Sequence, residues 1–241
     1  MSSYTVSLTG NSSTLRSILF PALRLQKERL WEAALLDITT YNSIPNVTEE
    51  VNNKIHYYKT KDKKKGTYSN MEVFHLPTGA YEINDINEAF QNHLGKDNIT
   101  ITGNNNTLKA EIKSKYYIDF GQDNSIGTLL GFPKTTEILE PDKTHTGDNT
   151  VTIMKVNSID VTCNIIQGSY RDGENRHILH TFYPTVAPGF KIVEKPQNLV
   201  YLPLNTTFIS DIVVNILDQH GNLIDFRGEA ITIRIHIKST V

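Results

Sequence analysis

The sequence contains little that points to covalent chemistry or to a membrane. It has 241 residues and a single cysteine, Cys163, which excludes an internal disulfide and a zinc site built from several cysteines. No apolar run approaches the length needed to cross a bilayer, so we expect no membrane span. Residues 1–8 lack the basic and apolar regions of a secretory signal peptide, which favours a reducing compartment.

An excess of charge of either sign is also missing. Lysine and arginine number 24 against 26 aspartates and glutamates, so net charge argues neither for nor against nucleic acid. Positive charge gathers only between Lys59 and Lys65, in the sequence KTKDKKK. We expect a solvated hairpin loop there, and the alternative is a patch that binds phosphate groups. Contact with nucleic acid is therefore an open alternative with little support.

Catalytic and cofactor motifs are absent as well. The sequence has no nucleophile elbow, no P-loop and no zinc-protease helix motif. His177 and His180 are three residues apart, and on a strand this spacing directs them to opposite faces, so they do not chelate one metal together. Cys163 lies in a strand-like run and is expected to be a buried core residue rather than a reactive thiol. We therefore predict no catalytic, cofactor-binding or metal-binding residues, and a protein that is not an enzyme.

The most regular pattern lies near the C-terminus. Isoleucine occupies every second position from Ile231 to Ile237, which places four isoleucines on one face of a strand. The preceding run, Phe208–Leu217, is rich in β-branched residues, and residues 218–222 (DQHGN) supply a turn. We predict that the two strands form a hairpin at the centre of an all-β core.

The run Phe208–Leu217 is apolar on both of its faces. A sandwich strand with a free outer face is usually more polar, so we expect a second cover for it. Another part of this chain or a neighbouring subunit could supply that cover. The apolar stretch Leu15–Pro21, which is interpreted as an N-terminal arm, raises the same question.

Short strands separated by turn residues fill most of the chain. Strand-like runs occur at residues 4–8, 30–38, 54–59, 150–156, 158–166, 177–183 and 190–194. Residues 30–36 could also form a helix, but the β-branched and aromatic residues that follow favour a strand. With the two C-terminal strands, this number of strands suits a single two-sheet jelly roll.

Residues 68–135 have a different pattern. A helix is predicted from an apolar face at helical spacing (Ile83, Ile86, Phe90 and Leu94), with a cap at Asn84 or Asp85 and a stop at Gly95. Further strands, a hairpin and a short helix are expected at residues 71–76, 98–102, 107–112, 116–120 and 125–132. These elements would form a compact α/β unit inserted between two β-rich parts.

The predicted fold class is therefore mainly β, a single jelly-roll β-sandwich with an inserted small α/β unit. Residues 1–67 would hold the N-terminal arm and the first jelly-roll strands. Residues 68–135 would be the inserted unit, and residues 136–241 the remaining jelly-roll strands. Without the insertion roughly 170 residues remain, which suits one β-sandwich and is too few for two.

Several longer stretches carry a resemblance to a known family. They are WEAALLDI at 31–38 with NSIPNV at 42–47, LPTGAYEI at 76–83, SIGTLLGF at 125–132 and DQHGNLIDFRGE at 218–229. Together these stretches resemble the minor capsid, or penton, proteins of Polinton/Maverick elements and the related adintoviruses. They are spread over most of the chain, and none of them is a catalytic signature.

The resemblance implies a structural capsid protein of the virion, assembled inside the host cell in the cytoplasm or the nucleus. Such a penton is a single jelly roll that forms homopentamers at the vertices of an icosahedral shell. It contacts double-jelly-roll major capsid proteins around it, and by analogy the N-terminal arm would face the shell. The alternative function is a carbohydrate- or receptor-binding jelly-roll module, either lectin-like or similar to a trimeric ligand. A cupin-type enzyme would need converging histidines, which His177 and His180 do not offer.

Overall fold

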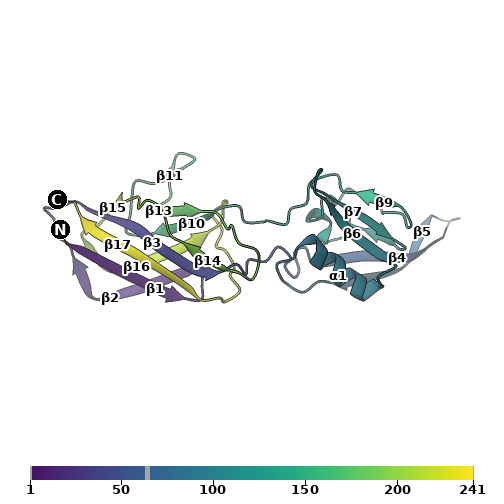
Figure 1. The fold of residues 1–241 in the computed structure, drawn as a ribbon, viewed down its shortest axis with the longest axis horizontal. Helices are drawn as coiled ribbons and strands as arrows, with labels where there is room; N and C mark the ends of the chain where they lie inside the picture. The colour runs from purple at the N-terminus through teal and green to yellow at the C-terminus, as the bar shows by residue number, and fades with distance from the viewer. Residues whose placement is uncertain (1, 63–65, 241) are drawn as a thin grey trace. The chain divides into compact units, whose positions relative to one another are not determined.

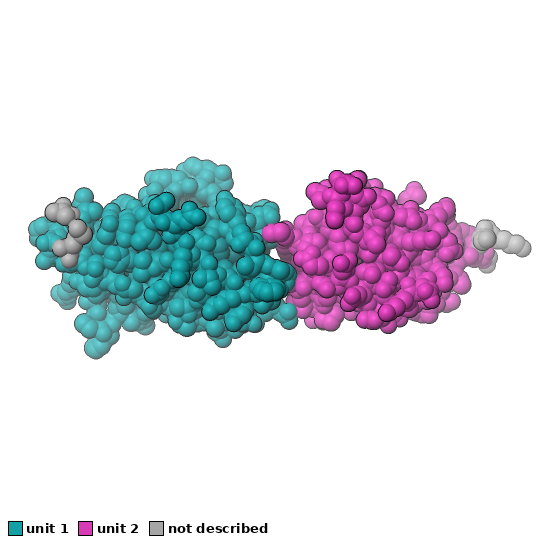
Figure 2. All heavy atoms as spheres, viewed as in Figure 1, with its two compact units in different colours: residues 1–44, 156–241 teal, residues 45–155 magenta. Residues whose placement is uncertain are grey.

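The computed structural model describes residues 2–62 and 66–240. The chain divides into two compact units (Figure 2). Unit 1 contains Met1–Ile44 and Val156–Val241, and unit 2 contains Pro45–Lys155. Unit 2 is thus inserted between two parts of unit 1. Each unit has its own hydrophobic core.

Unit 1 is a jelly-roll β-sandwich of two antiparallel sheets (Figure 1). The first sheet has the order β1-β17-β3-β14, and β15 also pairs with β3. Its strands are β1 (Ser3–Gly10), β17 (Ile231–Ser239), β3 (Trp31–Tyr41), β14 (Lys191–Glu194) and β15 (Leu202–Pro203). The second sheet contains, in order, β13 (Ile178–Phe182), β10 (Ile159–Cys163), β16 (Phe208–Leu217) and β2 (Thr14–Arg24). The predicted fold class is confirmed.

The core of unit 1 lies between the inner faces of the two sheets. All four isoleucines from Ile231 to Ile237 are fully buried, as the period of two in β17 predicts. They share one core with Ile212, Val214 and Ile216 of β16 in the other sheet. Burying a side chain of this size stabilises the fold by about 1.5–3 kcal/mol relative to leaving it exposed.

The predicted hairpin of the two C-terminal strands is wrong. Strand β17 pairs with β1 and β3, whereas β16 pairs with β10 and β2 in the opposite sheet. The turn at residues 218–222 does form, but residues 218–230 then carry the chain from one sheet to the other. A connection of this length exceeds the usual hairpin loop of about two to five residues. Two strands with one strongly apolar face each can bury those faces against one another only from opposite sheets.

The apolar stretch Leu15–Pro21 is part of a sandwich strand, not an arm. It lies within β2, which pairs antiparallel with β16 at the edge of the second sheet. The pairing shifts register between Ile209 and Asp211, and this irregularity turns Ile209 inward, where it is buried. The outer face of β16 is only half-buried, at Val213 and Leu217. Ile209 therefore belongs to the inner face, and the outer face of β16 is less apolar than simple alternation along the sequence predicts.

Unit 2 combines two small antiparallel sheets with one helix (Figure 1). One sheet has the order β5-β4-β8, and the other has the order β6-β7-β9. The elements are β4 (Lys54–Asp62), β5 (Thr67–His75), α1 (Ile83–Leu94), β6 (Ile99–Asn104), β7 (Lys109–Ser114), β8 (Tyr117–Asp119), the 3₁₀ turn η1 (Ile126–Thr128) and β9 (Thr144–Thr146). The helix starts at Ile83, earlier than a cap at Asn84 or Asp85 predicts, and it ends at Gly95 as predicted, where φ is 97°. Its N-cap is Glu82, two residues before Asn84 and three before Asp85, and the Asp85 carboxylate accepts a hydrogen bond from the Glu82 backbone N–H.

The inserted unit is longer at both ends than the predicted range of residues 68–135. Strand β4 belongs to it because it pairs with β5 and β8. Strand β9 belongs to it because it pairs with β7. The strand predicted at residues 150–156 does not form. Val151 and Ile153 instead pack against the core of unit 2 as extended chain.

The stretch SIGTLLGF owes its glycines to close packing in unit 2. A Cβ atom at Gly127 would come within 2.7 Å of the Phe120 side chain. Gly131 has a φ of 85°, and a Cβ there would overlap the backbone oxygen of Asn149. Neither position accepts a larger residue without movement of its neighbours. Where the sequence predicted a short helix, only the 3₁₀ turn η1 forms. The glycines of this stretch are explained by close packing and not by a helix.

Cys163 gives a direct test of the packing in unit 1. It lies on β10 inside the core, and burial raises the pKa of its thiol to about 11. At pH 8 only about one thiol in a thousand would be ionised, so we expect almost no reaction of the native chain with a thiol-specific disulfide reagent. Unfolding in denaturant should expose the thiol and give one equivalent of rapid reaction. Rapid labelling of the native chain would contradict the buried position.

Candidate assembly surfaces

The two lateral sides of the sandwich are the places where unit 1 offers open strand edges. One side carries β1 and β2, the edge strands of the first and second sheet. The other side carries β14 and β15 of the first sheet and β13 of the second. Edge strands present backbone N–H and C=O groups to a partner, and natural proteins usually protect them with charged side chains. The side chains found on these edges therefore indicate whether they are solvated or covered.

The first edge surface consists of Ile18 and Phe20 on β2 and Phe208 on β16. Phe20 is 100% exposed, Ile18 74% and Phe208 52%. Leu15 of β2 points into the core, so the alternation of the strand turns Ile18 and Phe20 outward. The guanidinium carbon of Arg24 lies 5.6 Å from the centroid of the Phe208 ring. Large apolar groups on an outward strand face are unusual in a solvated edge.

The second edge surface lies on the opposite lateral side, around β13 and β14. Its apolar members are Tyr41, Tyr183, Phe190 and Val193, all of them exposed. Val193 lies on β14, while Phe190 immediately precedes this strand, and the backbone N–H of Asn42 donates to the Phe190 carbonyl. Both lateral sides thus expose apolar groups, and the two sets of residues differ. A chain with two different apolar sides is suited to head-to-tail contacts between copies.

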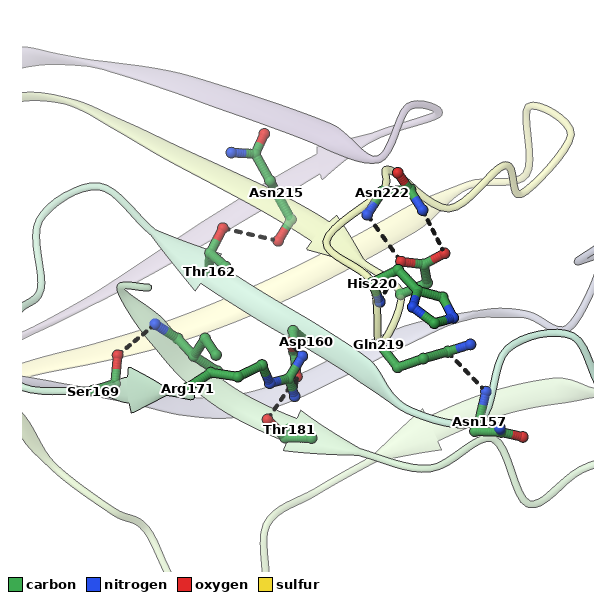
Figure 3. Close-up of polar contacts among 12 residues, drawn as sticks. Asn157, Asp160, Thr162, Ser169, Arg171, Thr181, Asn215, Gln219, His220 and Asn222 are labelled. Atoms are coloured by element: carbon green, nitrogen blue, oxygen red, sulfur yellow. Dashed lines mark hydrogen bonds and ion pairs between the residues drawn. The ribbon is translucent and has the colours of Figure 1, made fainter. Parts of the chain in front are cut away.

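A polar network closes the part of the second sheet's outer face that lies over β10 and β13 (Figure 3). Asp160 of β10 points away from the core and is nevertheless only 2% exposed. Arg171, on the hairpin of β11 (Tyr170–Arg171) and β12 (Glu174–Asn175), reaches over it and binds both carboxylate oxygens. Thr181 of β13 donates a hydrogen bond of 2.7 Å to the same carboxylate. All these groups are satisfied, so the network anchors the hairpin and offers no free acid or base.

The turn at residues 218–222 is a second polar feature, at the end of β16 (Figure 3). The carboxylate of Asp218 accepts hydrogen bonds from the backbone N–H groups of His220 and Asn222, both at 2.8 Å. Partial burial acts to raise the pKa of Asp218, but the hydrogen bonds from Asn222 and His220 outweigh it and lower the pKa. The stretch DQHGNLIDFRGE therefore begins with a self-bonded turn, which starts the crossing between the sheets.

The histidines singled out by the sequence do not come together. The Nδ1 atom of His177 lies 2.6 Å from the Ile166 carbonyl, and the Nε2 atom of His180 lies 3.0 Å from the Glu194 carboxylate. Within residues 2–62 and 66–240 no group of three or more His, Cys, Asp or Glu side chains could hold a metal ion. Across the same residues no helix is long and apolar enough to span a membrane.

The basic loop is described only in part, since residues 63–65 lie outside the described residues. Lys59 forms an ion pair with Glu72 at 2.6 Å. The Nζ atom of Lys61 lies 4.7 Å from the centroid of the Tyr68 ring. Both lysines thus already have partners within unit 2, which weakens the alternative of a phosphate-binding patch.

The fold defines a class of protein, namely a single jelly-roll sandwich with a separate unit inserted between its strands. No family model and no curated protein sequence matches this chain. Among solved structures, the chain is similar to the crystal structure of a selenomethionine-labelled mavirus penton protein. The TM-score is 0.51 at 11% sequence identity, and the match covers 99% of this chain and 100% of the penton chain. The chain therefore has a penton-like fold, and the likeness takes in both units.

Replacement of Asp160 by alanine tests the role assigned to the polar network. The change leaves the Arg171 guanidinium without its carboxylate in a largely buried place, and we expect a loss of about 2–3 kcal/mol in the free energy of unfolding of unit 1. The only tryptophan, Trp31, is buried in unit 1, so its fluorescence during denaturant unfolding reports on this unit. As a control, Glu174→Ala removes the partner of Arg176 in the same hairpin, an exposed pair worth less than about 1 kcal/mol. Equal effects of the two changes would contradict an anchoring role.

Proposed function

We propose that this chain is the penton of an icosahedral viral capsid, a structural protein that forms homopentamers at the vertices of the shell. The observation that carries the proposal is the fold-level match to the mavirus penton protein over nearly the whole of both chains. A jelly roll alone occurs in many classes of protein, so a fold match limited to unit 1 would say little about function. The match covers 99% of this chain and therefore also includes the inserted unit.

The two edge surfaces support a ring of identical subunits. A cyclic pentamer is a heterologous assembly, in which each subunit uses two different patches and the rotation closes the ring. Ile18, Phe20 and Phe208 would supply one patch, and Phe190 and Val193 would belong to the other. Contact between these two surfaces would remove exposed aromatic and aliphatic groups from water on both sides. This assignment gives β2 a contact with the neighbouring subunit in place of the shell-facing role expected for an N-terminal arm.

The partners follow from the same proposal. A penton occupies the vertex and is surrounded by the major capsid protein, here one built from double jelly rolls. Its place is the virion, after assembly in the cytoplasm or nucleus of the host cell. The buried, fully bonded network at Asp160 supports a structural rather than a catalytic role for the outer face of the second sheet.

Light scattering coupled to size-exclusion chromatography tests the pentamer. The purified full chain should have a mass five times that of the 27.2 kDa chain. Ile18→Ser combined with Phe20→Ser should shift the mass toward that of a single chain, because each lost apolar contact is worth about 1.5–3 kcal/mol and recurs at every interface. Both side chains are exposed in the single subunit, so the far-ultraviolet circular dichroism should not change.

Leu223→Ser is the matched control, since Leu223 is a 57% exposed apolar residue of unit 1 that lies outside both edge surfaces. This variant should keep the mass of the parent chain. A chain that stays monomeric at high micromolar concentration, or one that forms trimers, would overturn the homopentamer. Vertex placement is tested by imaging particles after co-expression with a major capsid protein, where five-fold density that excludes this chain would refute it.

A further inference from the structure

Unit 2 contains a pocket of about 610 Å³ that the capsid role does not use. It lies beside the β4–β5 hairpin and along the irregular segment that leads to β9. The lining residues are Lys61, Tyr68, Phe132, Thr136, Glu137, Ile138, Leu139, Glu140, His145, Thr146 and Asp148. All of them belong to unit 2, and the volume is within the range of about 300–1,000 Å³ typical of small-molecule sites.

Acceptor groups make up much of the polar lining of this pocket. The carboxylates of Glu137 and Asp148 are exposed. Glu140 is paired with Lys143, which offsets its charge. The Nε2 atom of His145 lies 2.8 Å from the Glu140 carbonyl oxygen, which can only accept, so the Nε2 atom carries the proton. In the neutral ring the Nδ1 atom is then an acceptor as well.

The pocket is also lined by residues that carry hydrogen-bond donors. The ammonium group of Lys61 lies at the face of the Tyr68 ring and 5.9 Å from the centroid of the Tyr117 ring. The hydroxyls of Thr136 and Thr146 can donate as well as accept. Within the described chain the Thr136 Oγ1 atom is buried and has no hydrogen-bond partner. Because this oxygen is shielded from solvent, the hydroxyl of the exposed residue Thr146 is the one that can meet a ligand.

The mixture of charges selects the kind of ligand. A cationic ligand would meet the Lys61 ammonium, and an anionic ligand would meet Glu137 and Asp148, so a net charge of either sign faces a like charge. A hydroxyl group both donates and accepts, and therefore suits a lining that carries both kinds of group. The aromatic and aliphatic part of the lining, which includes Tyr68, Ile138 and Leu139, suits the C–H face of a sugar ring.

We propose that this pocket of unit 2 is a glycan-binding site for a neutral mono- or oligosaccharide. Glu137 and Asp148 accept hydrogen bonds from sugar hydroxyls, Lys61 and Thr146 bond the remaining hydroxyl oxygens, and the apolar wall contacts the ring. On a particle surface such a site would attach the shell to glycosylated molecules. The proposal concerns unit 2 alone and does not depend on the number of subunits in the assembly.

The test is binding of the full chain to an array of neutral, sialylated and sulfated glycans, followed by isothermal titration with the methyl glycosides of the sugars that are retained. We expect selective retention of neutral glycans. Glu137→Gln combined with Asp148→Asn should weaken their binding at least tenfold, since the carboxylates bond hydroxyls more strongly than amides do. Both residues are exposed, so the fold should be kept.

Asp123→Asn is the matched control, because Asp123 is an exposed carboxylate of unit 2 that pairs with Lys134 outside the pocket. It should leave the affinity within twofold of the parent chain. Retention of only sialylated or sulfated glycans, no retention of any glycan, or equal binding by the double variant and the parent would each overturn the proposal. A monomeric mass together with selective neutral-glycan binding would refute the pentamer and leave the glycan site standing.

Discussion

The contact between the inner faces of β16 and β17 is the packing on which unit 1 depends. The two strands stand in opposite sheets, and their isoleucines and valines fill one core. Every other strand of the sandwich joins the structure by pairing outward from one of these two, directly or through a neighbour. Residues 218–230 connect the two strands: the chain turns at Asp218 and then crosses from one sheet to the other. Charge or polarity introduced on either inner face would therefore disturb both sheets at once.

The insertion does not interrupt this packing, because each unit keeps its own core. Unit 1 closes its sandwich from residues on both sides of the insertion, with strands β1 to β3 before it and β10 to β17 after it. Unit 2 buries Phe90 of α1, Phe120 and Phe132 in a separate cluster. Such an arrangement lets one part of a chain serve assembly while the other carries a site of its own. The proposed contacts of the ring rest on the edges of unit 1, and the proposed glycan site rests on unit 2.

The edges explain why apolar residues remain on the surface of unit 1. Alternate side chains of β2 and β14 point into the core, and Ile18, Phe20 and Val193 lie on the opposite, exposed faces of these strands. Over β10 and β13, the outer face of the second sheet is covered in a different way, by the β11–β12 hairpin anchored on Asp160 (Figure 3). A polar, satisfied cover on one face and apolar groups on the lateral sides indicate different roles for these surfaces. A face that is closed by its own chain needs no partner, whereas exposed aromatic edges favour one.

Most strands, the helix and the fold class follow from the sequence alone, because hydrophobic periodicity, caps and turn residues are local signals. Ile231–Ile237 was buried as its alternation required, and the helix over residues 83–94 ended at Gly95. Which strands pair does not follow from the sequence, since a turn after Leu217 is compatible both with a hairpin and with a crossing to the other sheet. The limits of the insertion depended on the long-range pairing of β4 and β9, which no local pattern reveals. The edge surfaces and the pocket likewise gather residues far apart in the chain, and their proximity is a property of the fold alone.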